Sequence, residues 1–79
     1  MIPEELRNVL SQNKEVMSGA ICFTGTRIPV SILLDNLREG VSLSEFFDAY
    51  PDVTEDQVQA LIDWEDRQVR QLLGLAYAH

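Results

Sequence analysis

The stretch Gly25-Thr26-Arg27-Ile28-Pro29-Val30 divides the chain of 79 residues into two unlike parts. The part before it is loosely patterned and interrupted by serine and glycine, whereas three helical patterns follow it. Pro29 fixes φ at about −65° and lacks an N–H, so it fits the first position of a helix. Gly25 can take a positive φ, and Thr26 can cap the helix that follows. The stretch predicts a turn that leads into the first core helix.

Three segments after this turn carry apolar residues at helical spacing. Gly40 supplies a left-handed stop after the first of them. The sequences Ser42-Leu43-Ser44-Glu45 and Thr54-Glu55-Asp56-Gln57 are capping boxes that open the second and the third. We expect the apolar stripe of the first helix to face the core. The predicted helices are 29–39, 43–50 and 54–72, and the stripe of the first is Val30, Leu33, Leu34 and Leu37.

The segment before the turn predicts two short strands, near residues 9–11 and 21–24. A ribbon this small is not stable alone, so it must pack on the helices or pair with a second copy. The connections between the helices are short, which makes the helices cross steeply, as in helix-turn-helix units. We therefore expect one mainly α domain over 1–79. Its N-terminal strand and turn segment is 1–28, and its three-helix, helix-turn-helix-like core is 29–79.

Two anchors of this sequence, Gly25 to Val30 and Tyr50-Pro51-Asp52, resemble the small prokaryotic family called domain of unknown function 433 (DUF433). The resemblance covers about residues 9–64. The other matching residues are Gly19, Ile21 to Phe23, Leu33, Leu34, Leu37, Glu39, Gly40, Glu45, Thr54 and Val58.

This resemblance implies a fold similar to helix-turn-helix proteins. Members are often encoded beside PIN-like nucleases, which implies the antitoxin half of a toxin–antitoxin pair. Residues 65–79 have no clear counterpart in the family pattern, so we expect the end of the third helix to serve this chain's own interface.

The charge is divided unevenly along the chain. The formal net charge is −7. Residues 1–34 hold three acidic and three basic residues, whereas residues 35–79 hold ten acidic residues and three arginines, so the excess of seven lies in the helical part. Proteins that bind nucleic acid usually present a basic face to the phosphates. The helical part is therefore expected to repel DNA and to attract a basic protein.

Catalytic chemistry has little support in the sequence. The single histidine is His79, and the single cysteine, Cys22, has no histidine near it in sequence. Gly25 is followed by Thr-Arg rather than by the Lys-Ser/Thr of a phosphate-binding loop. We expect no enzyme activity, no cofactor and no metal site. No apolar run approaches the length of a membrane span and no signal peptide is evident, so we expect a cytoplasmic protein without membrane contact.

Several residues are candidates for binding. Arg27 has two interpretations: a hydrogen-bonding anchor between the turn and a carboxylate or carbonyl of the helices, which we favour, or a contact to a partner or phosphate. Trp64 belongs either to the core or to an interface. The candidate partner interface is Trp64, Val69, Leu72, Leu73 and Tyr77. The candidate DNA contacts are Arg7, Lys14 and Arg27.

The sequence leaves three functions open. The first is an antitoxin-like interaction protein that binds and neutralises a PIN-like nuclease. The second is a helix-turn-helix transcriptional regulator that reads DNA with residues 54–70, although this segment holds five acids and two arginines. The third is a small dimerising domain without a nuclease partner. We expect a homodimer, because the third helix is long enough to project apolar residues past its own core. DNA is expected to bind only weakly or as part of a complex.

Overall fold

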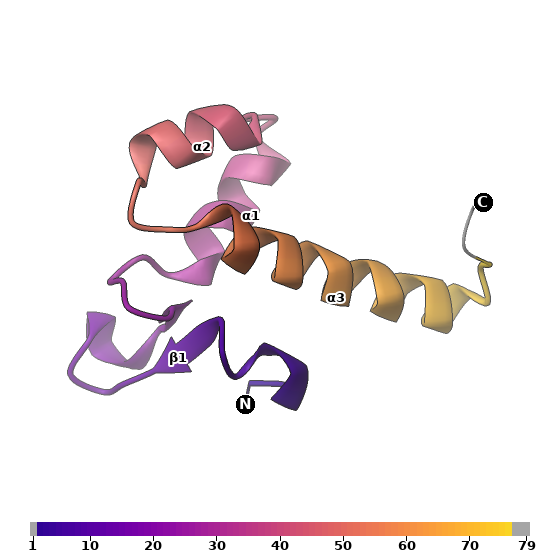
Figure 1. Ribbon diagram of the computed structural model, residues 1–79, viewed down its shortest axis with the longest axis horizontal. Helices are drawn as coiled ribbons and strands as arrows, with labels where there is room; N and C mark the ends of the chain where they lie inside the picture. Colours follow the sequence, from indigo (N-terminus) through magenta and orange to yellow (C-terminus); the bar gives the residue numbers. More distant parts are fainter. Residues whose placement is uncertain (1, 77–79) are drawn as a thin grey trace.

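The computed structural model describes residues 2–76. It confirms three helices preceded by a two-stranded antiparallel sheet (Figure 1). Each strand and long helix lies within one or two residues of its predicted limits, and two short 3-10 helices, η1 and η2, are additional. The elements are η1 (Glu4–Leu6), β1 (Leu10–Gln12), η2 (Met17–Gly19), β2 (Ile21–Phe23), α1 (Val30–Arg38), α2 (Leu43–Ala49) and α3 (Glu55–Leu73).

The two strands form a hairpin in which Leu10 lies opposite Phe23. Both of these side chains are buried in the core. Beyond β2, the chain turns and pairs with it again: the backbone N–H of Phe23 donates to the carbonyl of Ile28 at 3.0 Å, and Pro29 bridges to Cys22. The turn therefore acts as a third short segment beside β2 and fixes where α1 begins.

The predicted cap of α1 is wrong. The hydroxyl of Thr26 instead donates to the carbonyl of Phe23 at 2.8 Å and accepts from the N–H of Ile28 at 3.0 Å. Pro29 precedes the helix as its N-cap, with ψ of 144°, rather than occupying its first turn. Pairing with β2 holds Pro29 in extended backbone, so the helix starts one residue later. Gly25 takes a φ of 81°, as the turn prediction requires.

The other helix ends follow the local signals. Gly40 takes a φ of 81° directly after α1. Thr54 and Gln57 form the complete capping box of α3, with backbone-to-side-chain bonds of 3.1 and 3.0 Å. At α2 the hydroxyl of Ser42 accepts from the N–H of Glu45 at 3.1 Å, which is one of the two bonds of such a box.

One apolar core holds the hairpin and the helices together. Phe46 lies at its centre, with ring centroids 6.5 Å from Phe23 and 5.1 Å from Tyr50. The buried members of this core are Leu6, Leu10, Phe23, Leu33, Phe46, Val53, Val58 and Leu61.

The stripe of α1 is only partly buried, contrary to the prediction. Leu33 is completely buried, whereas 45% of Leu34 and 40% of Leu37 are exposed. Because α1 packs against α2 and β2, these neighbours cover the side of the helix that carries Leu33. The apolar stripe of α1 is therefore wider than the surface that α2 and β2 cover.

The third helix extends well past the other elements (Figure 1). Its buried residues, Val58 and Leu61, lie in the first half, and η1 packs beside the helix. Val69, Leu72 and Leu73 in the last turns are exposed, as the sequence predicted for a projecting end. Among the described residues, no helix is both long and apolar enough to cross a membrane.

Candidate protein-interaction surfaces

The first surface is an apolar one formed by α1 and the second half of α3. Leu37 of α1 and Ile62 and Val69 of α3 line a shallow groove of about 390 Å³, with Glu65 and Asp66 at its sides. Contiguous exposed apolar surface with polar residues at its rim is a common mark of an interaction site. We use the name α1–α3 face for the groove residues Leu37, Ile62 and Val69 together with the other exposed leucines of the same two helices, Leu34, Leu72 and Leu73.

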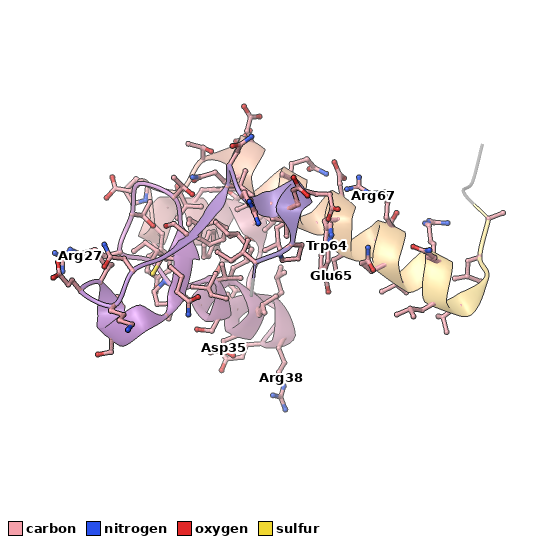
Figure 2. The ribbon with its side chains drawn as sticks, turned by 90° about the horizontal axis from the view of Figure 1, so that it is seen from below. Arg27, Asp35, Arg38, Trp64, Glu65 and Arg67 are labelled. Carbon is pink, nitrogen blue, oxygen red and sulfur yellow. The ribbon has the colours of Figure 1, made fainter. Side chains whose placement is uncertain are left out.

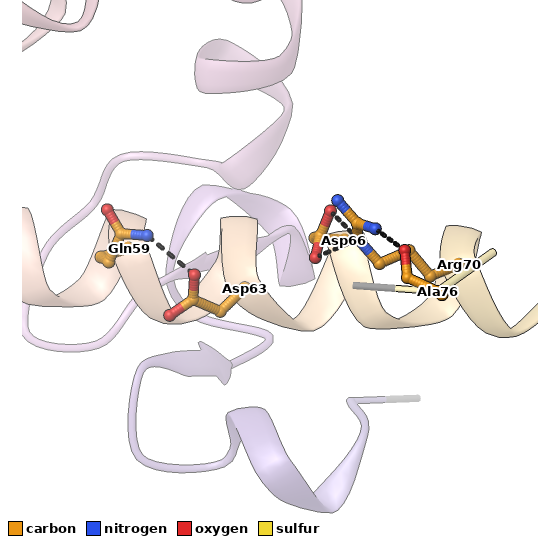
Figure 3. Close-up of polar contacts among 5 residues, drawn as sticks. All are labelled: Gln59, Asp63, Asp66, Arg70 and Ala76. Carbon is orange, nitrogen blue, oxygen red and sulfur yellow. Dashed lines mark hydrogen bonds and ion pairs between the residues drawn. The ribbon is translucent and has the colours of Figure 1, made fainter. Parts of the chain in front are cut away.

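Local interactions fix the projecting end of α3, although this end packs on no core. Gly74 takes a φ of 67°, and the N–H of Leu75 donates to the carbonyl of Arg70 at 2.8 Å, which closes the helix end. The guanidinium of Arg70 also holds both carboxylate oxygens of Asp66 at 3.0 Å and the carbonyl of Ala76 at 2.6 Å (Figure 3). The exposed leucines therefore stand on a helix with a defined end.

The second surface lies between α2 and α3. Leu43, Phe47 and Val58 supply apolar walls, and the carboxylates of Asp48 and Glu55 also line it. Its volume is about 460 Å³. We call it the α2–α3 groove. An aliphatic chain that ends in a positive charge matches both its walls and its carboxylates.

The third surface is a cleft of about 640 Å³ over the outer side of the hairpin. It joins the two sequence anchors in space, because residues 25–28 and Asp52 line the same cleft. Directly before the first anchor, the carbonyl of Thr24 accepts a hydrogen bond from the side-chain amide of Gln57 at 2.9 Å. This bond connects the turn after β2 to the start of α3.

Arg27 is not the anchor that we favoured from the sequence. Its side chain is exposed, and within residues 2–76 it makes no hydrogen bond or ion pair (Figure 2). Thr26 closes the turn instead, which leaves the neighbouring guanidinium free to face solvent at the cleft. The interpretation of Arg27 as a contact to a partner or phosphate stays open.

Trp64 belongs to the fold rather than to an exposed interface. Its side chain is half-buried against the core, and its indole N–H donates to Glu5 of η1. Of the other predicted interface residues, Val69, Leu72 and Leu73 are exposed, and Tyr77 lies outside the described residues.

The three candidate DNA contacts lie in three different segments of the N-terminal part of the chain. Arg7, Lys14 and Arg27 are all exposed. Arg7 precedes β1 and Lys14 follows it, so the strand separates them. Within residues 2–76, His, Cys, Asp and Glu side chains form no group of three that could hold a metal ion.

Sequence reasoning missed two features of these surfaces. The first is the α2–α3 groove: Asp48 and Glu55 are both visible as acids, but only the packing of the helices brings them to one groove. The second is the exposure of Leu34 and Leu37, because helical spacing does not indicate how much of an apolar stripe its neighbours cover.

The two anchors and their geometry agree with a family comparison. The family model described as protein of unknown function (DUF433) matches residues 10–64. The chain belongs to the DUF433 family. A crystal structure of a DUF433 member protein from Anabaena variabilis ATCC 29413 is similar, with a TM-score of 0.65 and 25% sequence identity. The similarity covers 89% of this chain and 80% of that one. The search of curated proteins found no match.

The DUF433 match ends at Trp64. The anchors, the cleft and the α2–α3 groove therefore lie inside the DUF433 region, whereas Val69, Leu72 and Leu73 lie beyond it. The family match therefore includes Leu37 and Ile62 of the α1–α3 face but not the exposed residues at the end of α3.

Proposed function

We propose that this DUF433 chain is an antitoxin-like interaction protein that binds and neutralises a PIN-like nuclease. The observation that carries the proposal is the α2–α3 groove, where apolar walls and two carboxylates meet in the half of the chain that holds the whole negative excess. The proposal puts the complex in the cytoplasm of a prokaryote, where a nuclease finds its RNA substrates.

The groove suits a basic side chain of such a nuclease. A nuclease needs positive charge where it binds the phosphate backbone. The methylene chain of a lysine or arginine can pack on Phe47, and its charged head can reach Asp48 or Glu55. An acidic partner that occupies this basic surface competes with nucleic acid for it, which is how binding would neutralise the enzyme.

The alternative is a helix-turn-helix DNA-binding regulator. The three helices with short connections favour it. The charges oppose it, because α3 begins with Glu55 and Asp56, where base-reading side chains of a recognition helix would lie. We therefore propose that the isolated chain binds double-stranded DNA only non-specifically, with a Kd of about 10⁻⁴ M or weaker at physiological salt.

The test first asks whether a PIN-like nuclease is encoded beside the gene, and then measures binding to that nuclease by calorimetry and by inhibition of RNA cleavage. We expect the parent to bind and inhibit, and the charge reversal Asp48→Lys with Glu55→Lys to weaken binding by about 100-fold. The matched control is Glu4→Lys with Glu15→Lys, which makes the same change of net charge outside the groove. Equal weakening by both variants would show a general charge effect and contradict the groove.

A mobility shift assay tests the DNA alternative. A specific DNA site bound with sub-micromolar Kd by the isolated chain would replace the interaction proposal by the regulator. Absence of binding to the nuclease, with the chain folded by circular dichroism, would reject the antitoxin-like function.

A further inference from the structure

We propose that a second copy of this chain covers the α1–α3 face, with the two α3 helices packed antiparallel across a two-fold axis. This goes beyond nuclease binding, which uses the α2–α3 groove at the other end of α3. The exposed apolar area at the end of α3 favours a partner that covers it. Leu72 is 82% exposed and Leu73 67% exposed, on a helix end that is closed by Gly74 and held by Arg70.

The groove and the leucines are complementary in position. The groove of Leu37, Ile62 and Val69 lies directly N-terminal to the projecting leucines on the same helix. With a rise of 1.5 Å per residue, Ile62 and Leu73 are about 16 Å apart along α3. An antiparallel pair centred midway between them sets each Leu73 beside the Ile62 of the other copy. One two-fold operation then fills both grooves, as an isologous interface requires.

The order of charges along α3 selects the antiparallel direction. Three acids, Asp63, Glu65 and Asp66, come before two arginines, Arg67 and Arg70. In the antiparallel register that sets Leu73 beside Ile62, Arg70 of each copy lies level with Glu65 of the other, whereas parallel packing sets like charges side by side. Arg70 already binds Asp66 within its own helix, so the second copy extends an existing network.

The same charges favour a second copy over a basic partner. Both grooves are lined by two acids, but Asp66 at the α1–α3 face is already paired with Arg70, whereas neither Asp48 nor Glu55 has an ion-pair partner among the described residues. A strongly basic partner is therefore better matched to the groove, and a chain with the same mixed order of charges is better matched to the α1–α3 face.

Sedimentation equilibrium on the full chain tests whether this face joins two copies. We expect the parent to be a dimer at micromolar concentration and Leu72→Glu with Leu73→Glu to weaken dimerisation by about 100-fold. The control is Met17→Glu, because Met17 is also half-exposed but lies on η2, away from this face. A monomeric parent, or a double variant that dimerises as tightly as the parent, would overturn the proposal. If the parent is monomeric alone and the double variant loses nuclease binding, the nuclease is the occupant of this face.

Disulfide trapping tests the direction, in a Cys22→Ala background. Antiparallel packing predicts that an Ile62→Cys copy and a Leu73→Cys copy cross-link when mixed and oxidised. Leu73→Cys alone should not cross-link, because its two cysteines would lie at opposite ends of the pair. Efficient cross-linking of Leu73→Cys to itself would show parallel packing and contradict the inference. Failure of the dimer can be told apart from failure of the proposed function, because the Leu72→Glu, Leu73→Glu variant should still bind the nuclease.

Discussion

The indole N–H of Trp64 donates a hydrogen bond to a carboxylate oxygen of Glu5, at 2.9 Å and across 59 positions of the chain. Glu5 belongs to η1, and its neighbour Leu6 is buried in the core. The bond and this buried side chain together dock the N-terminal segment beside α3. Docking of η1 thereby fixes the orientation of the one tryptophan in the chain.

The docking predicts that Glu5→Ala lowers stability. The variant removes the acceptor of a charged hydrogen bond, and we expect the free energy of unfolding in urea to fall by about 1 kcal/mol, since both groups are partly exposed. Trp64 emission should also shift to longer wavelength in the folded variant as water reaches the indole. Glu4→Ala is the control, because Glu4 lies in the same helix and makes no side-chain bond in the described structure. Equal effects of the two variants would contradict a specific role for Glu5.

Alanine substitution at the two adjacent leucines of α1, Leu33 and Leu34, should lower stability by very different amounts. Leu33→Ala should lower the free energy of unfolding by roughly 2–5 kcal/mol, since the substitution opens a cavity at a fully buried site. Leu34→Ala should cost less than about 1 kcal/mol in a monomeric sample, because almost half of that side chain is already in water. Thermal and urea unfolding at low protein concentration measure both values. A loss at Leu34 as large as that at Leu33 would mean that the whole stripe is covered in solution.

A third prediction concerns Gln57, which uses both ends of its amide. Its oxygen accepts from the N–H of Thr54 and its nitrogen donates to the carbonyl of Thr24. Glutamate is common at this position of a capping box. Gln57→Glu should nevertheless destabilise the fold by about 1–2 kcal/mol at neutral pH, because the carboxylate keeps the cap but faces the Thr24 carbonyl without a proton to donate.

The pH dependence distinguishes this cause from a general loss of helix stability. A protonated glutamate can donate to Thr24, so the pKa of the new carboxyl should lie above its usual value of about 4.3 in the folded state. The cost relative to the parent should therefore be present at neutral pH and shrink as the pH falls through that folded pKa. A cost that stays constant from pH 7 to pH 3 would reject the contact to Thr24 as its source. Urea unfolding across this pH range, with the parent measured beside the variant, supplies the comparison.

Features that depend on neighbours in sequence could be predicted well. The capping box of Thr54 and the stop at Gly40 set helix limits through contacts a few residues apart. Thr26 shows where such signals become ambiguous, since a threonine hydroxyl can cap a helix or close a turn. Pairing of the turn with β2 decided between these roles, and this pairing is a tertiary contact.

Features that depend on the assembled surface could not be predicted. Helical spacing identifies Leu33, Leu34 and Leu37 as one stripe, but it does not state how much of the stripe the neighbours cover. The role of Trp64 depends on a carboxylate 59 positions away. Charge counting correctly located the acids in the helical part, while the grouping of Asp48 with Glu55 required the crossing of α2 and α3.

The projecting end of α3 also has a consequence for hydrogen exchange. Amides near Val58 and Leu61 can open only when the core opens, so they should exchange at a rate set by global unfolding. Amides in the last two turns can open by local fraying, at a much smaller free-energy cost, because no core contact is broken there. A single continuous helix is therefore expected to contain two segments of different protection, and the change between them lies close to Trp64, where the docking of η1 ends.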